Sequence, residues 1–218
     1  MDWNFNMAAL VPSMQALPFP VTWFSSPATM APMIEQVKRL LGNYRTPAPD
    51  PPLRSANSAV IVPLFEHEGE IWITFIKRSE MIGLHRGQMG FPGGMSEPGD
   101  QGDSLRTALR EAEEEIGLLP GDIDISGTLK MQPTIKTGLL VQPFVGIIPW
   151  PYRFSPDPLE IQSIHHARLR NLAEEVQDAG NRFGLIPPVY PVDEQPVWGL
   201  SARIVGELLE IITPLWEG

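Results

Sequence analysis

Three glutamates in the segment 110–118, Arg-Glu-Ala-Glu-Glu-Glu-Ile-Gly-Leu, have the spacing most typical of chemistry. Each residue of an α-helix advances by about 100°, so Glu114 and Glu115 fall about 60° and about 40° to either side of Glu111. Glu113 points away from this narrow arc. Carboxylates so close repel one another unless water or a cation lies among them. The spacing therefore predicts either a solvated acidic face or a site for a divalent metal.

The neighbouring residues favour the metal site. Arg110 lies four residues before Glu114 and can pair with it, and a Phe-Pro-Gly-Gly loop at 91–94 precedes the acidic segment. Hard carboxylate oxygens suit Mg²⁺ or Mn²⁺, and a chain without cysteine has no thiolate ligands to offer. We expect Glu111, Glu114 and Glu115 to be the metal ligands.

A helix over 104–116 must position these glutamates. Its apolar residues recur at i, i+3, i+4, i+7 and i+11 and form a second stripe beside the acidic one: Leu105, Ala108, Leu109, Ala112 and Ile116. Asp103 or Ser104 can cap its start, and Gly117 suits the left-handed position that ends a helix. One stripe would then face the core and the other a cleft.

The acidic segment resembles the second half of the Nudix box, Gly-x5-Glu-x7-Arg-Glu-U-x-Glu-Glu-x-Gly-U, where U is aliphatic. Its positions are filled by Arg110, Glu111, Ala112, Glu114, Glu115, Gly117 and Leu118. The first half departs from the pattern, because Gly102 and Ser96 stand where a glutamate and a glycine are expected. With Gly94 as the first glycine, the loop is two residues longer, and its available acids are Glu97, Asp100 and Asp103.

This longer loop is similar to that of the coenzyme A pyrophosphatase-like subgroup, Phe-Pro-Gly-Gly-x-x-Asp-Pro-x-Asp. The matching stretch here is 91–100, and Arg78-Ser79 and His85-x-Gly87 also occupy the subgroup's positions. Gly83 stands where the subgroup usually has an arginine associated with coenzyme A preference. The resemblance implies metal-dependent hydrolysis of a diphosphate linkage in a nucleoside diphosphate derivative, with a coenzyme A-like substrate favoured. The alternatives are ADP-ribose, a dinucleotide, or nucleotide binding without hydrolysis.

The resemblance also implies roles for individual residues. Arg110, Glu111 and Glu114 would be catalytic, with water displacing a phosphate and a carboxylate acting as general base. Glu160, before a predicted strand, is the downstream candidate for that base, although an ordinary exposed glutamate is an equal interpretation. The groups expected to contact the small-molecule diphosphate substrate are Gly93, Gly94, Arg78 and His85.

Composition is consistent with a single soluble domain. The 218 residues are 43% hydrophobic, enough for one sizeable core. A formal net charge of −10 argues against a general nucleic-acid surface. We find no apolar run long enough for a membrane span and no signal segment, so we expect a cytoplasmic protein without a membrane partner.

The order of predicted elements fits an α/β fold, the Nudix α/β/α sandwich with a mixed β-sheet. We expect residues 1–52 to be an N-terminal extension and 53–218 the Nudix domain. The extension would hold a helix at 30–44 and a proline-rich linker at 46–52. The first 25 residues show no pattern, and we expect them to be disordered or to pack on a second subunit of a homodimer. The domain's other expected elements are strands at 59–65, 71–76, 127–131, 139–148 and 161–165 and helices at 169–177 and 200–212.

Overall fold

The computed structural model describes residues 31–46, 56–81, 86–134, 138–176 and 188–216. Within these residues one mixed sheet has eight strands, with the central order β3-β2-β1-β7-β5. Strand β7 runs parallel to β1, whereas β2 and β4 run antiparallel to it, and β8 pairs with the outer side of β2. The strands of this sheet are β1 (Ser58–His67), β2 (Glu70–Arg78), β3 (Met89–Gly90), β4 (Gly93–Met95), β5 (Asp124–Thr128), β6 (Gln132–Pro133), β7 (Leu140–Ile147) and β8 (Ile161–Arg168).

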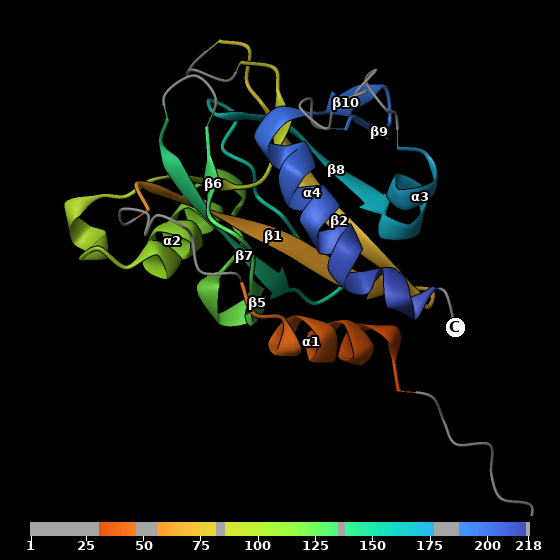
Figure 1. Cartoon of the computed structure of the whole chain (residues 1–218). Helices are drawn as coiled ribbons and strands as arrows, with labels where there is room; N and C mark the ends of the chain where they lie inside the picture. The colour runs from red at the N-terminus through yellow and green to blue at the C-terminus, as the bar shows by residue number, and fades with distance from the viewer. Residues whose placement is uncertain (1–30, 47–55, 82–85, 135–137, 177–187, 217–218) are drawn as a thin grey trace, which may run out of the picture. The chain divides into compact units, whose positions relative to one another are not determined.

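Helices cover both faces of the sheet, which explains why β1 is a continuous apolar run rather than an alternating one. Helix α2 (Ser104–Ile116) packs Ala108, Ala112 and Ile116 on one face. Helix α4 (Gly199–Ile212) crosses the other face (Figure 1). The expected α/β/α sandwich with a mixed sheet is confirmed.

Smaller elements complete the layer that contains α4. They are α1 (Met33–Asn43), α3 (Leu169–Glu174) and a separate hairpin of β9 (Tyr190–Val192) and β10 (Gln195–Val197). Their buried apolar side chains join those of α4 and the sheet in one cluster. No helix among the described residues is long and apolar enough to cross a membrane.

The expected helix at 104–116 has the bounds of α2. The Asp103 carboxylate accepts the backbone N–H of Leu105 at 2.9 Å, and Gly117 ends the helix at a φ of 65°. The strands expected at 59–65 and 71–76 correspond to β1 and β2, which pair antiparallel as a hairpin. The strand expected at 127–131 lies earlier, at 124–128, because its pairing with β7 starts at Asp124 opposite Ile147.

The expected domain boundary at residue 52 differs from the compact unit, which runs from Ala31 to Gly218. Helix α1 belongs to this unit because its apolar stripe needs a partner: Val37 and Leu41 are buried in the core shared with α4. The Tyr44 hydroxyl also donates to Glu207 on α4 at 2.8 Å. The expectations for the first 25 residues and for the linker beyond residue 46 lie outside the described residues.

Candidate active site

Two glycines bring the 91–94 loop against helix α2. Gly93 has a φ of 152°, and a Cβ there would overlap the Ala59 carbonyl and Val60 of β1. A Cβ at Gly94 would overlap the Glu111 carboxylate. We expected these glycines to let backbone approach a phosphate. In the structure the protein's own strand and carboxylate fill the space that the missing side chains leave.

Glu115 lies beneath this turn, with a side chain only 2% exposed. Its Oε1 accepts from Arg78 Nη1 at 2.7 Å, and its Oε2 accepts from the Gly93 N–H at 2.9 Å. Burial raises the pKa of Glu115 to about 7, although Arg78 and the Gly93 N–H act against this. We expected a ligand on a solvent-facing arc, and the structure instead places a buried carboxylate with both oxygens engaged.

Arg78, expected to contact substrate, is also turned inward. Besides Glu115 it donates to the Gly93 carbonyl at 2.9 Å, so one guanidinium joins the end of β2, the glycine turn and α2. Sequence spacing gave no signal for this pairing, because the two residues lie on different elements that only the folded sheet brings together.

Arg110 organises the acids on the outer side of α2. It donates to Glu111 Oε1 and Glu114 Oε2, each at 2.9 Å, and to the Met95 carbonyl at 3.1 Å. It also forms a two-point contact with Asp100, with both distances 3.1 Å. The expected pairing of Arg110 with Glu114 is confirmed.

Each loop acid has a partner within the loop or at the start of α2. Asp100 is 3% exposed, and Arg110 holds the pKa of its carboxyl well below the usual range, with help from the N–H of Glu97 and the Thr107 hydroxyl. Asp103 caps α2, and Glu97 closes a reciprocal capping contact with Asp100. The inserted loop thus uses its acids to hold Arg110 and the helix start.

Glu111 lies at the centre of the remaining negative charge. Burial raises the pKa of its carboxyl, and the charges of Glu114 and Glu160 raise it further, whereas Arg110 opposes them. Glu160 is close because its carbonyl accepts the N–H of Ser79 at 2.7 Å, which ties the loop before β8 to the end of β2. The structure therefore places the downstream glutamate beside the acidic helix.

This donor set fits a hard divalent cation in part. The carboxylate oxygens Glu111 Oε2 and Glu114 Oε1 and the carboxylate of Glu160 accept no hydrogen bond from the residues described. Among those residues, no three acidic or histidine side chains are already close enough to form a complete metal site. Mg²⁺ binds through one or two carboxylates and keeps several waters, so Glu111 with Glu114 or Glu160 would suffice to hold it. His85 lies outside the described residues.

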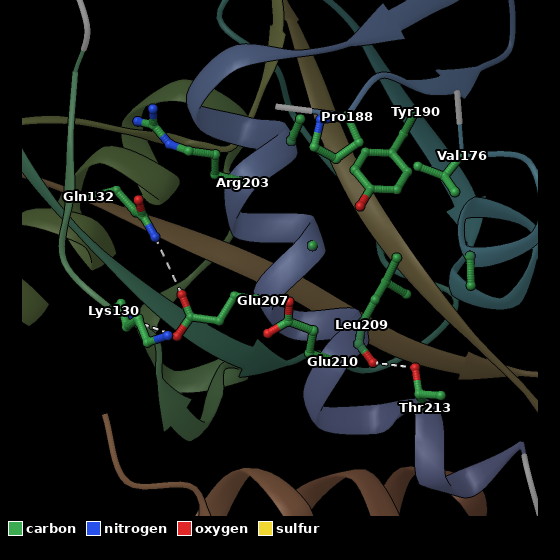
Figure 2. A pocket seen from close by; sticks show the side chains of 13 residues that line it. Lys130, Gln132, Val176, Pro188, Tyr190, Arg203, Glu207, Leu209, Glu210 and Thr213 are labelled. Atoms are coloured by element: carbon green, nitrogen blue, oxygen red, sulfur yellow. Dashed lines mark hydrogen bonds between the residues drawn. The ribbon is translucent and has the colours of Figure 1, made fainter. Parts of the chain in front are cut away.

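A cavity of about 490 Å³ lies on the opposite face of the sheet, beside α4. Figure 2 shows Glu207 at its wall, accepting from the Lys130 backbone N–H at 2.8 Å and from Gln132 Nε2 at 3.5 Å. Tyr190 and Arg203 line the same cavity. None of the predicted site residues does, so the acidic cluster and this cavity are separate features.

A mixed sheet between helices, with an acidic helix placed against a glycine turn, defines the class of protein. The NUDIX domain family model matches residues 55–178, and the chain belongs to the Nudix hydrolase family. It is 32% identical over 166 residues to Nudix hydrolase 22, chloroplastic, from Arabidopsis thaliana, covering 70% of this chain and 54% of that one. The chain thus spans about half the length of that relative.

Two further relatives are matched over more of their length. The human mitochondrial coenzyme A diphosphatase NUDT8 is 30% identical, covering 74% of this chain and 71% of that one. The Nudix hydrolase NudL of Shigella flexneri, described as uncharacterized, is 33% identical, covering 75% and 87%.

Solved structures agree on the fold. A Caenorhabditis elegans Ap4A hydrolase in a binary complex has a TM-score of 0.50 at 16% identity, covering 74% of this chain and 99% of that one. A MutT/nudix family protein from Enterococcus faecalis has a TM-score of 0.50 at 10% identity, covering 83% and 70%.

Proposed function

We propose that this protein hydrolyses the diphosphate linkage of a nucleoside diphosphate derivative with the help of Mg²⁺ or Mn²⁺. The observation that carries the proposal is the position of Glu111, a half-buried carboxylate with Glu114 and Glu160 close by and Arg110 as its main counter-charge. Several carboxylates beside a single guanidinium repel one another, and this repulsion lowers the stability of the folded protein. A bound cation would offset the repulsion.

Each residue has a distinct role in this proposal. Glu111 and Glu114 would hold the cation, which supplies neutralisation of the diphosphate and a water made acidic by coordination. Arg110 orients both carboxylates through its 2.9 Å contacts. Glu160 is exposed, and its carboxylate would take a proton from the attacking water.

Glu115 remains a proposed ligand, but its place differs from that of the other two. Its oxygens face Arg78 and the Gly93 N–H, so it could reach a cation only after exchanging one of these contacts. We therefore propose that Glu115 contributes mainly by fixing the glycine turn against which Glu111 lies.

The substrate we favour is coenzyme A or a close derivative. The support is the loop of the coenzyme A pyrophosphatase-like subgroup, together with a relative whose name is coenzyme A diphosphatase. ADP-ribose and dinucleotides carry the same diphosphate and are the alternatives.

A substrate panel tests the proposal. Purified protein is incubated with coenzyme A, ADP-ribose and diadenosine polyphosphates, with and without millimolar Mg²⁺ or Mn²⁺, and the nucleotide products are separated by chromatography. We expect metal-dependent cleavage, with coenzyme A split between the two phosphates of its diphosphate linkage. Binding of these compounds without any cleavage would instead support a nucleotide-binding domain that does not hydrolyse.

A further inference from the structure

Ser163, His165 and Asp193 form a hydrogen-bonded chain that the proposed diphosphatase does not use. Ser163 Oγ lies 2.7 Å from His165 Nε2, and His165 Nδ1 lies 2.6 Å from Asp193 Oδ2. Ser163 and His165 are two positions apart on β8 and so share one face of the strand. Asp193 lies in the turn between β9 and β10, where its φ is 52°.

The carboxylate fixes the direction of the proton chain. An ionised aspartate can only accept hydrogen bonds, so Nδ1 of His165 carries the proton that points to Asp193. In the neutral ring Nε2 then has a free lone pair and accepts the hydroxyl proton of Ser163. A hydroxyl, an imidazole and a carboxylate in this order form the arrangement that activates a serine nucleophile.

The surroundings of His165 keep its ring in place and leave the hydrogen-bonded residues accessible to solvent. The His165 side chain is 17% exposed and that of Asp193 is 63% exposed. His166, the next residue, points to the other face and packs among Phe65, Trp150 and Phe154. Of the three histidines that the structure describes, His165 alone has both ring nitrogens hydrogen-bonded to side chains that could take part in proton transfer.

A cation lies directly opposite the serine. Ser163 pairs across the strands with Lys77 of β2, and opposed residues have Cβ atoms about 4.5 to 5.5 Å apart on one face. Lys77 forms no ion pair with the residues described. Its ammonium could therefore stabilise negative charge on a carbonyl oxygen next to Ser163.

The hydrogen-bonded residues Ser163, His165 and Asp193 lie on the other side of the sheet from the acidic helix. His165 is opposite Phe75, and Phe75 belongs to the core beneath α4, whereas α2 packs on the second core cluster. The β9–β10 hairpin that carries Asp193 packs on the α4 side. The two sites can therefore be tested independently.

We propose that Ser163 is a base-activated nucleophile that takes the acyl group of small activated esters, with His165 as base and Asp193 holding its tautomer. Ser163 Oγ bonds to the ester carbonyl carbon and its proton passes to His165 Nε2. The ester C–O bond then breaks, and the alcohol leaves with that proton. Water releases the acyl group as a carboxylic acid, passing a proton through His165 back to Ser163.

The test uses p-nitrophenyl acetate with chelator present, so that the divalent-cation site is inactive. We expect a burst of p-nitrophenol and an acetyl group on the peptide that contains Ser163, found by mass spectrometry. Ser163→Ala and His165→Gln should abolish both signals. Asp193→Asn and Lys77→Met should slow the burst by about a hundredfold and about tenfold, respectively.

Matched controls separate this site from general surface acylation. His67 is an exposed histidine, and Ser126 is a serine on β5, so His67→Gln and Ser126→Ala should keep the full burst. Ser163→Ala should retain the wild-type melting temperature and the wild-type rate of diphosphate cleavage. A fluorophosphonate probe that labels Ser163 in the wild-type protein gives a second reading that needs no variant. Acetyl groups found only on lysines or the N-terminus, or an unchanged burst in Ser163→Ala, would overturn the proposal.

Discussion

Arg78 and Glu115 form a 2.7 Å ion pair that joins the end of strand β2 to helix α2 beneath the Gly93 turn. Glu115 is almost fully buried, whereas Arg78 is 27% exposed, so the pair has one desolvated member. Breaking such a pair leaves a buried charge without its partner. The pair therefore links the stability of the fold to the geometry of the candidate active site.

At pH 8, where Glu115 is ionised, Arg78→Gln should lower the free energy of unfolding by about 3 kcal/mol, because removing one partner of a buried pair typically costs about 3 to 5 kcal/mol and Arg78 is partly solvated. Denaturant unfolding measures the change. Arg106→Gln is the matched control: its exposed pair with Asp103 at 3.6 Å should contribute less than about 1 kcal/mol. Equal effects from the two substitutions would contradict the special position of Arg78.

The pKa of Glu115 predicts a pH dependence of stability. Glu115 loses its proton near pH 4.3 when unfolded but near pH 7 when folded, so between these values the folded state binds more protons. The free energy of unfolding should therefore fall, by up to about 3 kcal/mol, as pH rises from about 4.5 to about 7. Glu111 acts in the same direction, whereas the lowered pKa of Asp100 acts below this window.

Glu115→Gln tests this assignment, because glutamine keeps the shape but cannot ionise. Its free energy of unfolding, measured by denaturant titration from pH 4 to pH 8, should vary less over this window than that of the wild type. If the variant keeps the full wild-type slope, another group is responsible.

Gly94→Ala should displace the Glu111 carboxylate, since a Cβ at this position overlaps it. A displacement of this kind in catalytic geometry lowers turnover by about 10- to 100-fold. Gly99→Ala in the same loop is the control, because a Cβ there has no neighbour within 4 Å. The two variants are compared by their steady-state rates of diphosphate cleavage at saturating Mg²⁺. Equal rates would show that catalysis does not depend on the close approach of Gly94 and Glu111.

Substrate preference should depend on Gly83, where the related subgroup usually has an arginine. Gly83→Arg should lower the Michaelis constant for coenzyme A more than for ADP-ribose, because a guanidinium pairs strongly with the additional 3′-phosphate. Competition kinetics with both substrates measures the ratio. A wild-type enzyme that already prefers coenzyme A strongly and does not respond to the substitution would contradict this reading.

Much of the fold could be predicted from residue patterns. The α2 stripe, its Asp103 cap and Gly117 gave the helix its correct bounds, because all three signals are local. The strands β3, β4, β6, β9 and β10 were missed because two or three residues containing glycine or proline show no alternation. Helix α1 was placed outside the domain because a sequence shows an apolar stripe but not what covers it.

The parts of the candidate site that lie within one helix could also be predicted from the sequence. Helical spacing grouped the three glutamates, and the pairing of Arg110 with Glu114 followed from their separation of four residues. Burial of Glu115 by Arg78 and Gly93 depends on contacts between distant segments, which spacing does not encode. The proximity of Glu160 to Glu111 likewise depends on the contact between its loop and the end of β2.

A thermal-shift titration tests whether a cation binds the acidic helix. Mg²⁺ or Mn²⁺ that binds only the folded protein stabilises it by about 2.7 kcal/mol at 100 times the dissociation constant, so the melting temperature should rise and chelator should reverse the rise. Glu114→Gln should weaken the shift. A melting temperature that stays constant while calorimetry detects binding would mean that the ion binds the unfolded chain as tightly as the folded protein, and it would contradict a site formed by the folded acidic helix.

The rate of diphosphate cleavage in Glu111→Gln, compared with Glu113→Gln, tests the central claim most directly. Both substitutions remove one negative charge from α2, but Glu111 lies in the acidic cluster and Glu113 is exposed on another side of the helix. With saturating Mg²⁺, we expect Glu111→Gln to lower turnover by about 100-fold or more and Glu113→Gln to leave it within about twofold of the wild type. Equal turnover in the two variants would contradict the proposal that Glu111 holds the catalytic cation.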